Sequence, residues 1–315
     1  MTLADGEPRP HLAEYRCSPW TQAQGVDPIG SAGMLDELLL VEWPLPWPAD
    51  VSEIAALAPA AAHPRARLMT VVPRADDAEV DGLARVVHRR RAGTHRLEGV
   101  DHRVPLADVP DLLAALLDEP ERPLADWPSV VGAAPAEILV CGHGRRDPCC
   151  GRWGTLLHAE LAARHPEVRL WRCSHTGGHR FAPTAITLPD GRAWAYVDGD
   201  LVAQVLARTG DVAALAEHDR GSLAFDPWAQ VVERELFVRT GWGWLDVDVT
   251  GTHTEVADDG RSARVHMAWT GAGGSGVADA EVEVTRVLPV LVCGSPPEEA
   301  VKSSPELALR HLAIS

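Results

Sequence analysis

The chain has 315 residues, of which 46% are hydrophobic, and its formal net charge at pH 7 is −16. That length fits two or three packed units, and the acidic charge argues against a partner with a phosphate backbone, such as nucleic acid. No apolar run approaches the roughly 20 residues of a membrane-spanning helix, and residues 1–10 lack the basic and apolar parts of a signal peptide. We therefore expect a cytoplasmic protein that binds neither nucleic acid nor membrane.

The first 130 residues alternate strand and helix signals. The patterns predict strands over 37–42, 67–72, 85–95 and 96–105, with a turn near Gly93, and helices over 51–62 and 108–117. The proline-rich stretch 118–129 is typical of a linker. These elements form the first predicted unit, residues 1–130.

A second unit is predicted over residues 131–212. It contains strands over 137–140 and 168–171, a strand hairpin over 183–188 and 192–197, and helices over 151–164 and 200–208. Its strand order is close to that of the first unit, which a duplication would explain.

The third predicted unit, residues 213–315, starts with a helix over 227–240. Apolar and polar residues then alternate over 245–249 and 263–269 and again from Val282, which indicates a small antiparallel sheet with one covered face. A last helix is expected over 305–312.

Cysteine provides the first chemical signal. The six cysteines are Cys17, Cys141, Cys149, Cys150, Cys173 and Cys293. They are too sparse for a disulfide scaffold, and four of them fall between residues 141 and 173. Clustered cysteines in a chain of this size more often bind metal or do redox chemistry. We expect Cys17 and Cys293, which lie far from this cluster, to be buried or incidental.

Two loops carry these cysteines together with histidines. The run CGHGRRDPCCG occupies 141–151, after the first strand of the second unit, and CSHTGGHRFA occupies 173–182, after the next strand. A strand–helix–strand crossover makes the two strands parallel, so both loops leave the same end of the sheet. Thiolates with imidazoles suit zinc or an iron–sulfur cluster with mixed ligands. Gly177 and Gly178 allow the backbone to bend so that His175 and His179 face one point.

The two runs resemble the sucrase/ferredoxin-like family, strongly over about 137–206 and more weakly over the first unit. The resemblance implies an α/β (α+β) fold, in which a thioredoxin-like ferredoxin domain follows a second thioredoxin-like unit and precedes the small sheet. It also implies a [2Fe–2S] cluster of the bis-histidine type. The residues that match the family's cluster ligands are Cys141, Cys150, His175 and His179. The extra cysteine before the expected ligand leaves the choice between Cys149 and Cys150 open.

The resemblance further implies single-electron transfer with a redox partner protein, and the acidic chain favours a partner with a basic face. Two neutral imidazoles in place of two thiolates make a cluster easier to reduce, so we expect a potential above the all-cysteine range. We also expect that potential to fall as pH rises, because the non-ligating imidazole nitrogens can lose protons. We do not expect a sucrase activity, since the sequence shows no paired-carboxylate signature of glycoside hydrolysis.

Three alternatives stay open from the residues alone. The C-x-H pairs Cys141-x-His143 and Cys173-x-His175 could form a different ligand set. A structural zinc domain could use the same ligands as the cluster. A thiol-based oxidoreductase is the third, although no C-x-x-C redox pair is present.

Several neighbours of the proposed ligands have expected roles of their own. His143 is expected to anchor its loop or donate a hydrogen bond near the site. Cys173 is expected to pack at the end of its strand. Arg146 and Asp147 are expected to form a local ion pair that shapes the loop.

Overall fold

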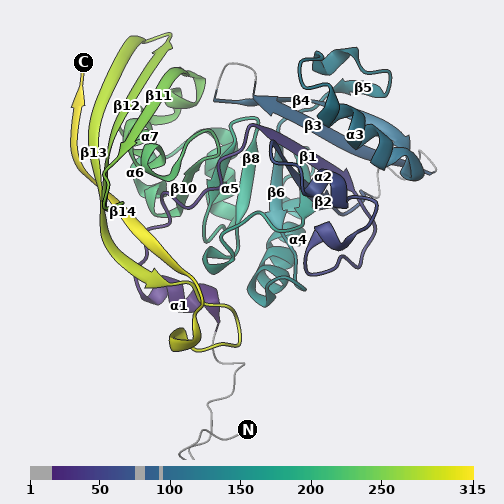
Figure 1. The fold of residues 1–315 in the computed structure, drawn as a ribbon, viewed down its shortest axis with the longest axis horizontal. Coiled ribbons are helices and arrows are strands. Elements are labelled where there is room, and N and C mark those ends of the chain that lie inside the picture. The colour runs from purple at the N-terminus through teal and green to yellow at the C-terminus, as the bar shows by residue number, and fades with distance from the viewer. Residues whose placement is uncertain (1–15, 75–81, 92–94) are drawn as a thin grey trace, which may run out of the picture.

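The computed structural model describes residues 16–74, 82–91 and 95–315, so the turn expected near Gly93 lies outside the described part. Within those residues the centre is a ten-stranded mixed sheet in the spatial order β10-β9-β8-β6-β7-β2-β1-β3-β4-β5 (Figure 1). The strands of this sheet are β1 (Glu37–Glu42), β2 (Ala66–Val71), β3 (Leu83–Arg91), β4 (Leu97–Pro105), β5 (Val130–Ala133), β6 (Glu137–Cys141), β7 (Arg169–Cys173), β8 (Ala185–Leu188), β9 (Arg192–Trp194) and β10 (Asp219–Ser222).

Two halves of this sheet repeat one strand order. In the first half, β1 lies between its parallel neighbour β2 and its antiparallel neighbour β3, which pairs with β4. In the second half, β6 lies in the same way between β7 and β8, and β8 pairs with β9. The halves meet where β2 and β7 run antiparallel, with Val71 opposite Cys173. The carboxyl ends of β2 and β7 therefore meet in the middle of the sheet.

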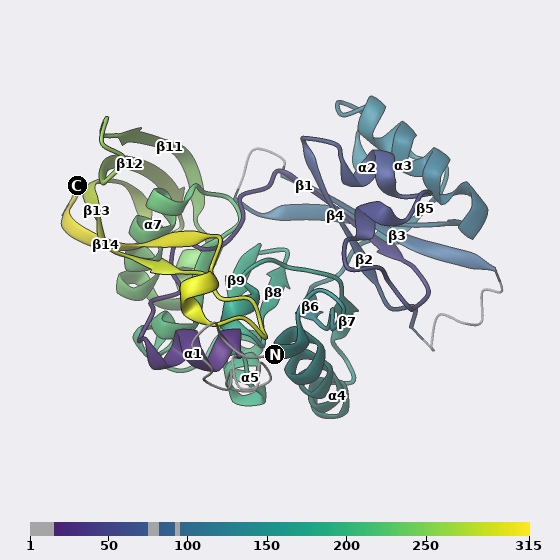
Figure 2. The ribbon, with the colours of Figure 1, turned by 60° about the horizontal axis from the view of Figure 1, so that its bottom comes forward.

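Helices cover the two halves separately (Figure 2). The α-helices of the described residues are α1 (Cys17–Ala23), α2 (Ala58–Ala61), α3 (Val109–Asp118), α4 (Thr155–Arg164), α5 (Gly199–Ala207), α6 (Val212–Leu215) and α7 (Pro227–Thr240). Leu39 of β1 packs in one apolar cluster with Leu113 of α3, and Val140 of β6 packs in another with Leu157 of α4. All six residues of β1 are buried, as expected for an inner strand of a sheet that is covered on both faces.

A second sheet is antiparallel, in the order β11-β12-β13-β14, and forms a curved wall beside α7 (Figure 1). Its strands are β11 (Asp248–Val256), β12 (Ser262–Gly271), β13 (Gly274–Pro289) and β14 (Ser303–Ile314). Val265 and Met267 of β12 are buried in one cluster with Val232 and Leu236 of α7. The prediction of a small sheet with one covered face is confirmed, and with it the mixed α/β fold class.

The helix expected over 305–312 is wrong, because this segment is part of β14. Leu307 and Leu309 lie opposite Val284 and Val282 of the long strand β13. The free edge of β13 supplies a hydrogen-bond ladder that outweighs the high intrinsic helix propensity of this segment, which is rich in leucine and alanine. Pro305 is tolerated there because β14 lies at the edge of its sheet.

Smaller differences lie at element boundaries. The helix expected over 51–62 is reduced to a 3₁₀ turn at Val51–Glu53 and the short α2. The strands β5 and β10 were not predicted; β10 follows the expected boundary at 212 and pairs with β9 in the central sheet. The three predicted units stay predictions. Among the described residues no helix combines the length and the apolar character that crossing a bilayer requires.

Candidate metal centre

The two cysteine- and histidine-bearing loops start side by side. Strands β6 and β7 are parallel, and Cys141 at the end of β6 is the register partner of Cys173 at the end of β7. The predicted parallel arrangement is therefore confirmed, and both loops leave the same edge. Cys141 and Cys173 are each fully buried.

The adjacent cysteines Cys149 and Cys150 point to different places. Asp147 caps this turn, since its Oδ1 accepts the backbone N–H groups of Cys149 at 2.8 Å and Cys150 at 3.1 Å. Cys150 then opens a π-helical segment, Cys150–Gly154, which leads into α4. The Cys150 thiol contacts Cys141, whereas the Cys149 Sγ lies 3.2 Å from the Cys293 Sγ. The structure thus places Cys150, and not Cys149, beside Cys141.

The Cys141 thiol is placed to be an anion. Contact with Cys150, and after it with His175 and the backbone of Thr176 and His143, lowers the pKa of Cys141 well below its usual range. The same contact raises the pKa of Cys150. Cys141 therefore loses its proton more readily than Cys150. A thiolate at Cys150 as well would place two negative charges together in a buried site, which requires a cation next to them.

The two histidines of the second loop face one another, with ring centroids 6.3 Å apart. Gly178 has a left-handed φ of 67°, and a Cβ there would lie 2.4 Å from the guanidinium of Arg220. Buried Arg220 donates to the Gly177 carbonyl at 3.2 Å and so supports this turn from behind. The glycine and the arginine together fix the bend that brings His175 and His179 to one side.

Each histidine keeps a nitrogen for a ligand. His179 Nδ1 lies 3.1 Å from Asp147 Oδ2, which leaves its Nε2 free of that contact. A histidine that binds a metal usually donates its other ring N–H to a carboxylate in this way. His175 Nδ1 is buried and has no hydrogen-bond partner among the described residues. These unused nitrogens and the thiol pair fit an iron–sulfur cluster with mixed ligands.

The neighbouring residues have mostly structural roles. His143 Nε2 lies 2.7 Å from the Pro48 carbonyl oxygen, so His143 anchors its loop as expected. Burial raises the pKa of the Cys173 thiol, which therefore packs as a small apolar side chain. The expected Arg146–Asp147 pair is wrong. Arg146 instead donates to Asp50 at 3.0 Å, because Asp147 turns inward to cap the turn.

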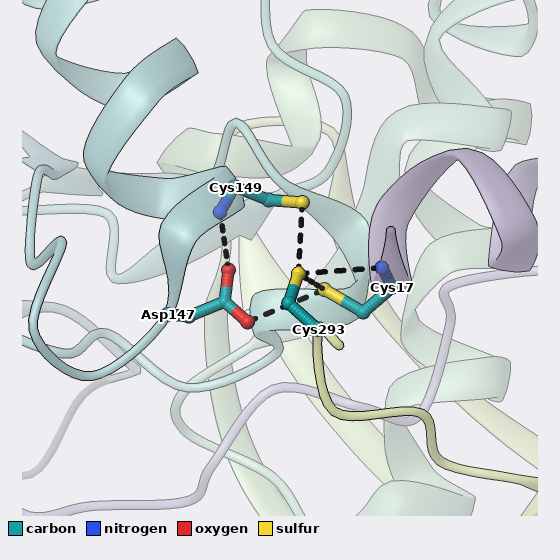
Figure 3. A group of neighbouring side chains, drawn as sticks. All are labelled: Cys17, Asp147, Cys149 and Cys293. Atoms are coloured by element: carbon teal, nitrogen blue, oxygen red, sulfur yellow. Dashed lines mark hydrogen bonds between the residues drawn. The ribbon is translucent and has the colours of Figure 1, made fainter. Parts of the chain in front are cut away.

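A second group of ligand-type side chains lies next to this centre and was not predicted. Cys17, Asp147, Cys149 and Cys293 place their Sγ and carboxylate atoms within 4.8 Å of one another (Figure 3). Cys17 is fully buried, as expected, and Cys293 is half-buried. In the sequence only the doubled cysteine at 149–150 hinted at this group.

A cleft of about 850 Å³ opens beside the centre. His143 and His175 line it on the side of the second half of the sheet, while Asp50, Arg65 and Arg67 line it on the side of the first half. Arg67 donates to the His175 carbonyl at 2.7 Å. Of the four predicted ligands, His175 is the one that lines this cleft.

The comparisons with known proteins agree with this fold. A family model described as sucrase/ferredoxin-like matches residues 28–221, more than half of the chain and most of both sheet halves. The chain belongs to the sucrase/ferredoxin-like family. The match includes all four predicted ligands, Cys141, Cys150, His175 and His179, but neither Cys17 nor Cys293.

A curated relative in this comparison is "Altered inheritance of mitochondria protein 32" of Kluyveromyces lactis. It is 44% identical over 48 residues, which is 15% of this chain and 15% of the relative. The similarity thus covers a small part of either protein. No solved structure matches the chain.

Proposed function

We propose that this protein holds a [2Fe–2S] cluster through Cys141, Cys150, His175 and His179 and transfers single electrons. The observation that carries the proposal is that the buried Cys141 thiol contacts both the buried Cys150 thiol and the His175 side chain. When bound, such a cluster supplies a site that takes up and releases one electron.

The chain's own groups would set the charge at this point. Cys141 and Cys150 supply two negative charges in a buried place. Arg67 and Arg220 lie close enough for their charges to interact with Cys141, and they donate to the carbonyls of His175 and Gly177. Positive charge there favours the reduced and more negative state of the site.

His179 would hold a proton at Nδ1 and donate it to Asp147, whose Oδ1 is already fixed by two backbone N–H groups. This contact would set the ring's orientation, so that Nε2 faces the thiol pair. His175 lines the cleft and would be the group closest to a docked partner.

We further propose a redox partner protein with a basic face. The net charge of −16 attracts such a partner over long distances. Electron-transfer rates with a cationic acceptor should then fall as salt screens this attraction. A rate that rises with salt would contradict the proposed charge of the partner.

The test of histidine ligation is the midpoint potential measured against pH by protein-film voltammetry. We expect a potential in the bis-histidine range of roughly −150 to +300 mV, above the value of about −400 mV for plant-type ferredoxins. It should fall as pH rises, because the oxidised site gives up imidazole protons more readily than the reduced one. A potential that stays flat between about pH 6 and 10 would contradict ligation by His175 and His179.

A further inference from the structure

The group of four side chains beside the proposed cluster has the atoms and spacing of a metal site. The Cys149 and Cys293 sulfurs are 3.2 Å apart, the Cys17 and Cys293 sulfurs 3.4 Å, and Cys17 Sγ lies 3.3 Å from Asp147 Oδ2 (Figure 3). Bonds of about 2.3 Å in a tetrahedral zinc site put two sulfurs roughly 3.8 Å apart. An outward shift of a few tenths of an ångström per sulfur is enough to admit the ion.

We propose that Cys17, Asp147, Cys149 and Cys293 bind one Zn²⁺ ion. Three soft thiolates and one carboxylate oxygen complete a tetrahedron, which is the preferred geometry of structural zinc. Binding replaces the three thiol protons, which leave to solvent, and bonds from the three sulfurs and Asp147 to the ion take their place. The site shares no ligand with the proposed cluster, and it is linked to that cluster by Asp147 Oδ2, which also contacts Nδ1 of His179 at 3.1 Å.

The surroundings hold these side chains in place before an ion arrives. Asp147 Oδ1 is fixed by the backbone N–H groups of Cys149 and Cys150, which turns Oδ2 toward the group. The backbone N–H of Cys17 lies 3.4 Å from Cys293 Sγ and can donate to a thiolate there. Cys17 and Cys149 pack in one apolar cluster with Leu291, which limits the access of water.

The arrangement suits a metal better than a disulfide. A disulfide would join two sulfurs and leave the third and the carboxylate without a function. Here the Cys293 sulfur lies within 3.4 Å of both the other sulfurs, and Asp147 Oδ2 lies 3.3 Å from the Cys17 sulfur. All four ligand atoms fit around one point.

The ion would join three distant parts of the chain. Cys17 opens α1, Asp147 and Cys149 belong to the loop after β6, and Cys293 lies in the connection between β13 and β14. It would therefore clamp the N-terminal helix and the small sheet onto the loop that carries Cys150. This gives both terminal regions a structural role.

The experiment is metal analysis of the full-length protein purified without oxygen from zinc-supplemented cells. We expect one zinc per chain in the wild type and in Cys141→Ala, which should lose its iron. Cys293→Ala should show at least a tenfold lower zinc content and keep its iron, whereas Cys293→Asp, which retains an anionic ligand, should recover zinc. Cys173→Ala is the matched control, a buried cysteine outside the group, and should keep its zinc.

A second measurement covers variants that fail to fold. Co²⁺ added to zinc-free wild-type protein should give the visible bands of a tetrahedral thiolate site, and Zn²⁺ should abolish them. A wild type that holds no zinc and takes up no Co²⁺ overturns the proposal. A Cys149–Cys293 disulfide in the anaerobic protein also overturns it. So does a zinc content that falls in Cys141→Ala and stays unchanged in Cys293→Ala. A wild-type protein that contains zinc but no iron would contradict the proposed cluster and would leave the zinc site standing.

Discussion

The two halves of the central sheet share a strand order, but they differ at the ends of their parallel strands. In the second half, β6 ends at Cys141 and β7 at Cys173. In the first half, β1 ends at Glu42 and β2 at Val71. The topology alone therefore does not make a metal centre, which depends on the residues that follow the strands.

The first half of the sheet contacts the two loops that carry the proposed ligands. Pro48, from the loop after β1, accepts from His143, and Asp50 pairs with Arg146. Arg67 of β2 donates to the carbonyl of His175. One half therefore carries the proposed ligands, while the other anchors their loops and forms the opposite wall of the cleft.

The largest expected effect comes from removing a proposed ligand from the second half. Cys141→Ser and Cys150→Ser should lose essentially all iron, because the buried centre would keep a single thiolate. Cys149→Ser is the matched control and should retain iron, since its side chain points to Cys293. Iron content per chain decides this, and iron that depends on Cys149 and not on Cys150 would refute the ligand assignment.

The contact between the halves can be broken at Arg89 of β3. Arg89 is buried, and its Nε donates to Glu137 of β6 at 2.7 Å. Arg89→Met removes the closer of the two arginines at the buried Glu137 carboxylate and leaves it with Trp171 and, at 3.7 Å, Arg169, at a cost of about 3 kcal/mol in the free energy of unfolding. Urea unfolding measures this.

The control for that variant is Arg239→Ala, which removes an exposed ion pair with Glu235 and should cost less than about 1 kcal/mol. Equal losses in the two variants would show that the contact between the halves contributes no more than a surface pair.

Acid should weaken the first half through two buried histidines. Burial lowers the pKa of His95 and of His102 to about 4, against about 6.5 in the unfolded chain. The unfolded state then binds more protons between these values, so stability present above pH 6.5 is lost as pH falls to 4. Each histidine accounts for about 3 kcal/mol of that loss.

His95→Leu tests this, because both ring nitrogens of His95 are buried without a hydrogen-bond partner among the described residues. Urea unfolding at pH 7 and pH 4.5 should show a smaller acid loss in His95→Leu than in the wild type. His253→Leu, at an exposed position, should match the wild type. An unchanged acid loss in His95→Leu would contradict the assignment.

The smallest expected effect is the change in midpoint potential on removing the positive charge of Arg67, a residue of the first half that lies near the proposed cluster. Arg67→Gln should lower the midpoint potential on the order of 60 mV, the shift that equals a tenfold change for a one-electron couple. The reason is that Arg67 is half-buried and interacts with Cys141. Arg146→Gln, which removes a more exposed arginine paired with Asp50, is the control and should shift the potential less.

The parts of this fold that local sequence patterns encode could be predicted. The buried strand β1 and helix α7 were predicted with their bounds, because apolar residues and prolines mark them in the sequence. The convergence of the loops after β6 and β7 followed from the parallel pairing that a strand–helix–strand crossover produces.

The rest depends on contacts between distant segments. The segment at β14 became a strand because β13 offers an edge, which no local pattern reports. Cys17 and Cys293 are 276 positions apart and meet only because the connection after β13 folds back onto α1. The separation of Cys149 from Cys150 required the geometry of the turn that Asp147 caps.

The measurement that tests the central claim most directly is the visible absorption spectrum of the protein purified without oxygen, with iron and acid-labile sulfide assayed on the same sample. The proposal predicts a red-brown protein with two irons and two sulfides per chain. A colourless protein that contains neither iron nor sulfide, even after reconstitution with both, would contradict it.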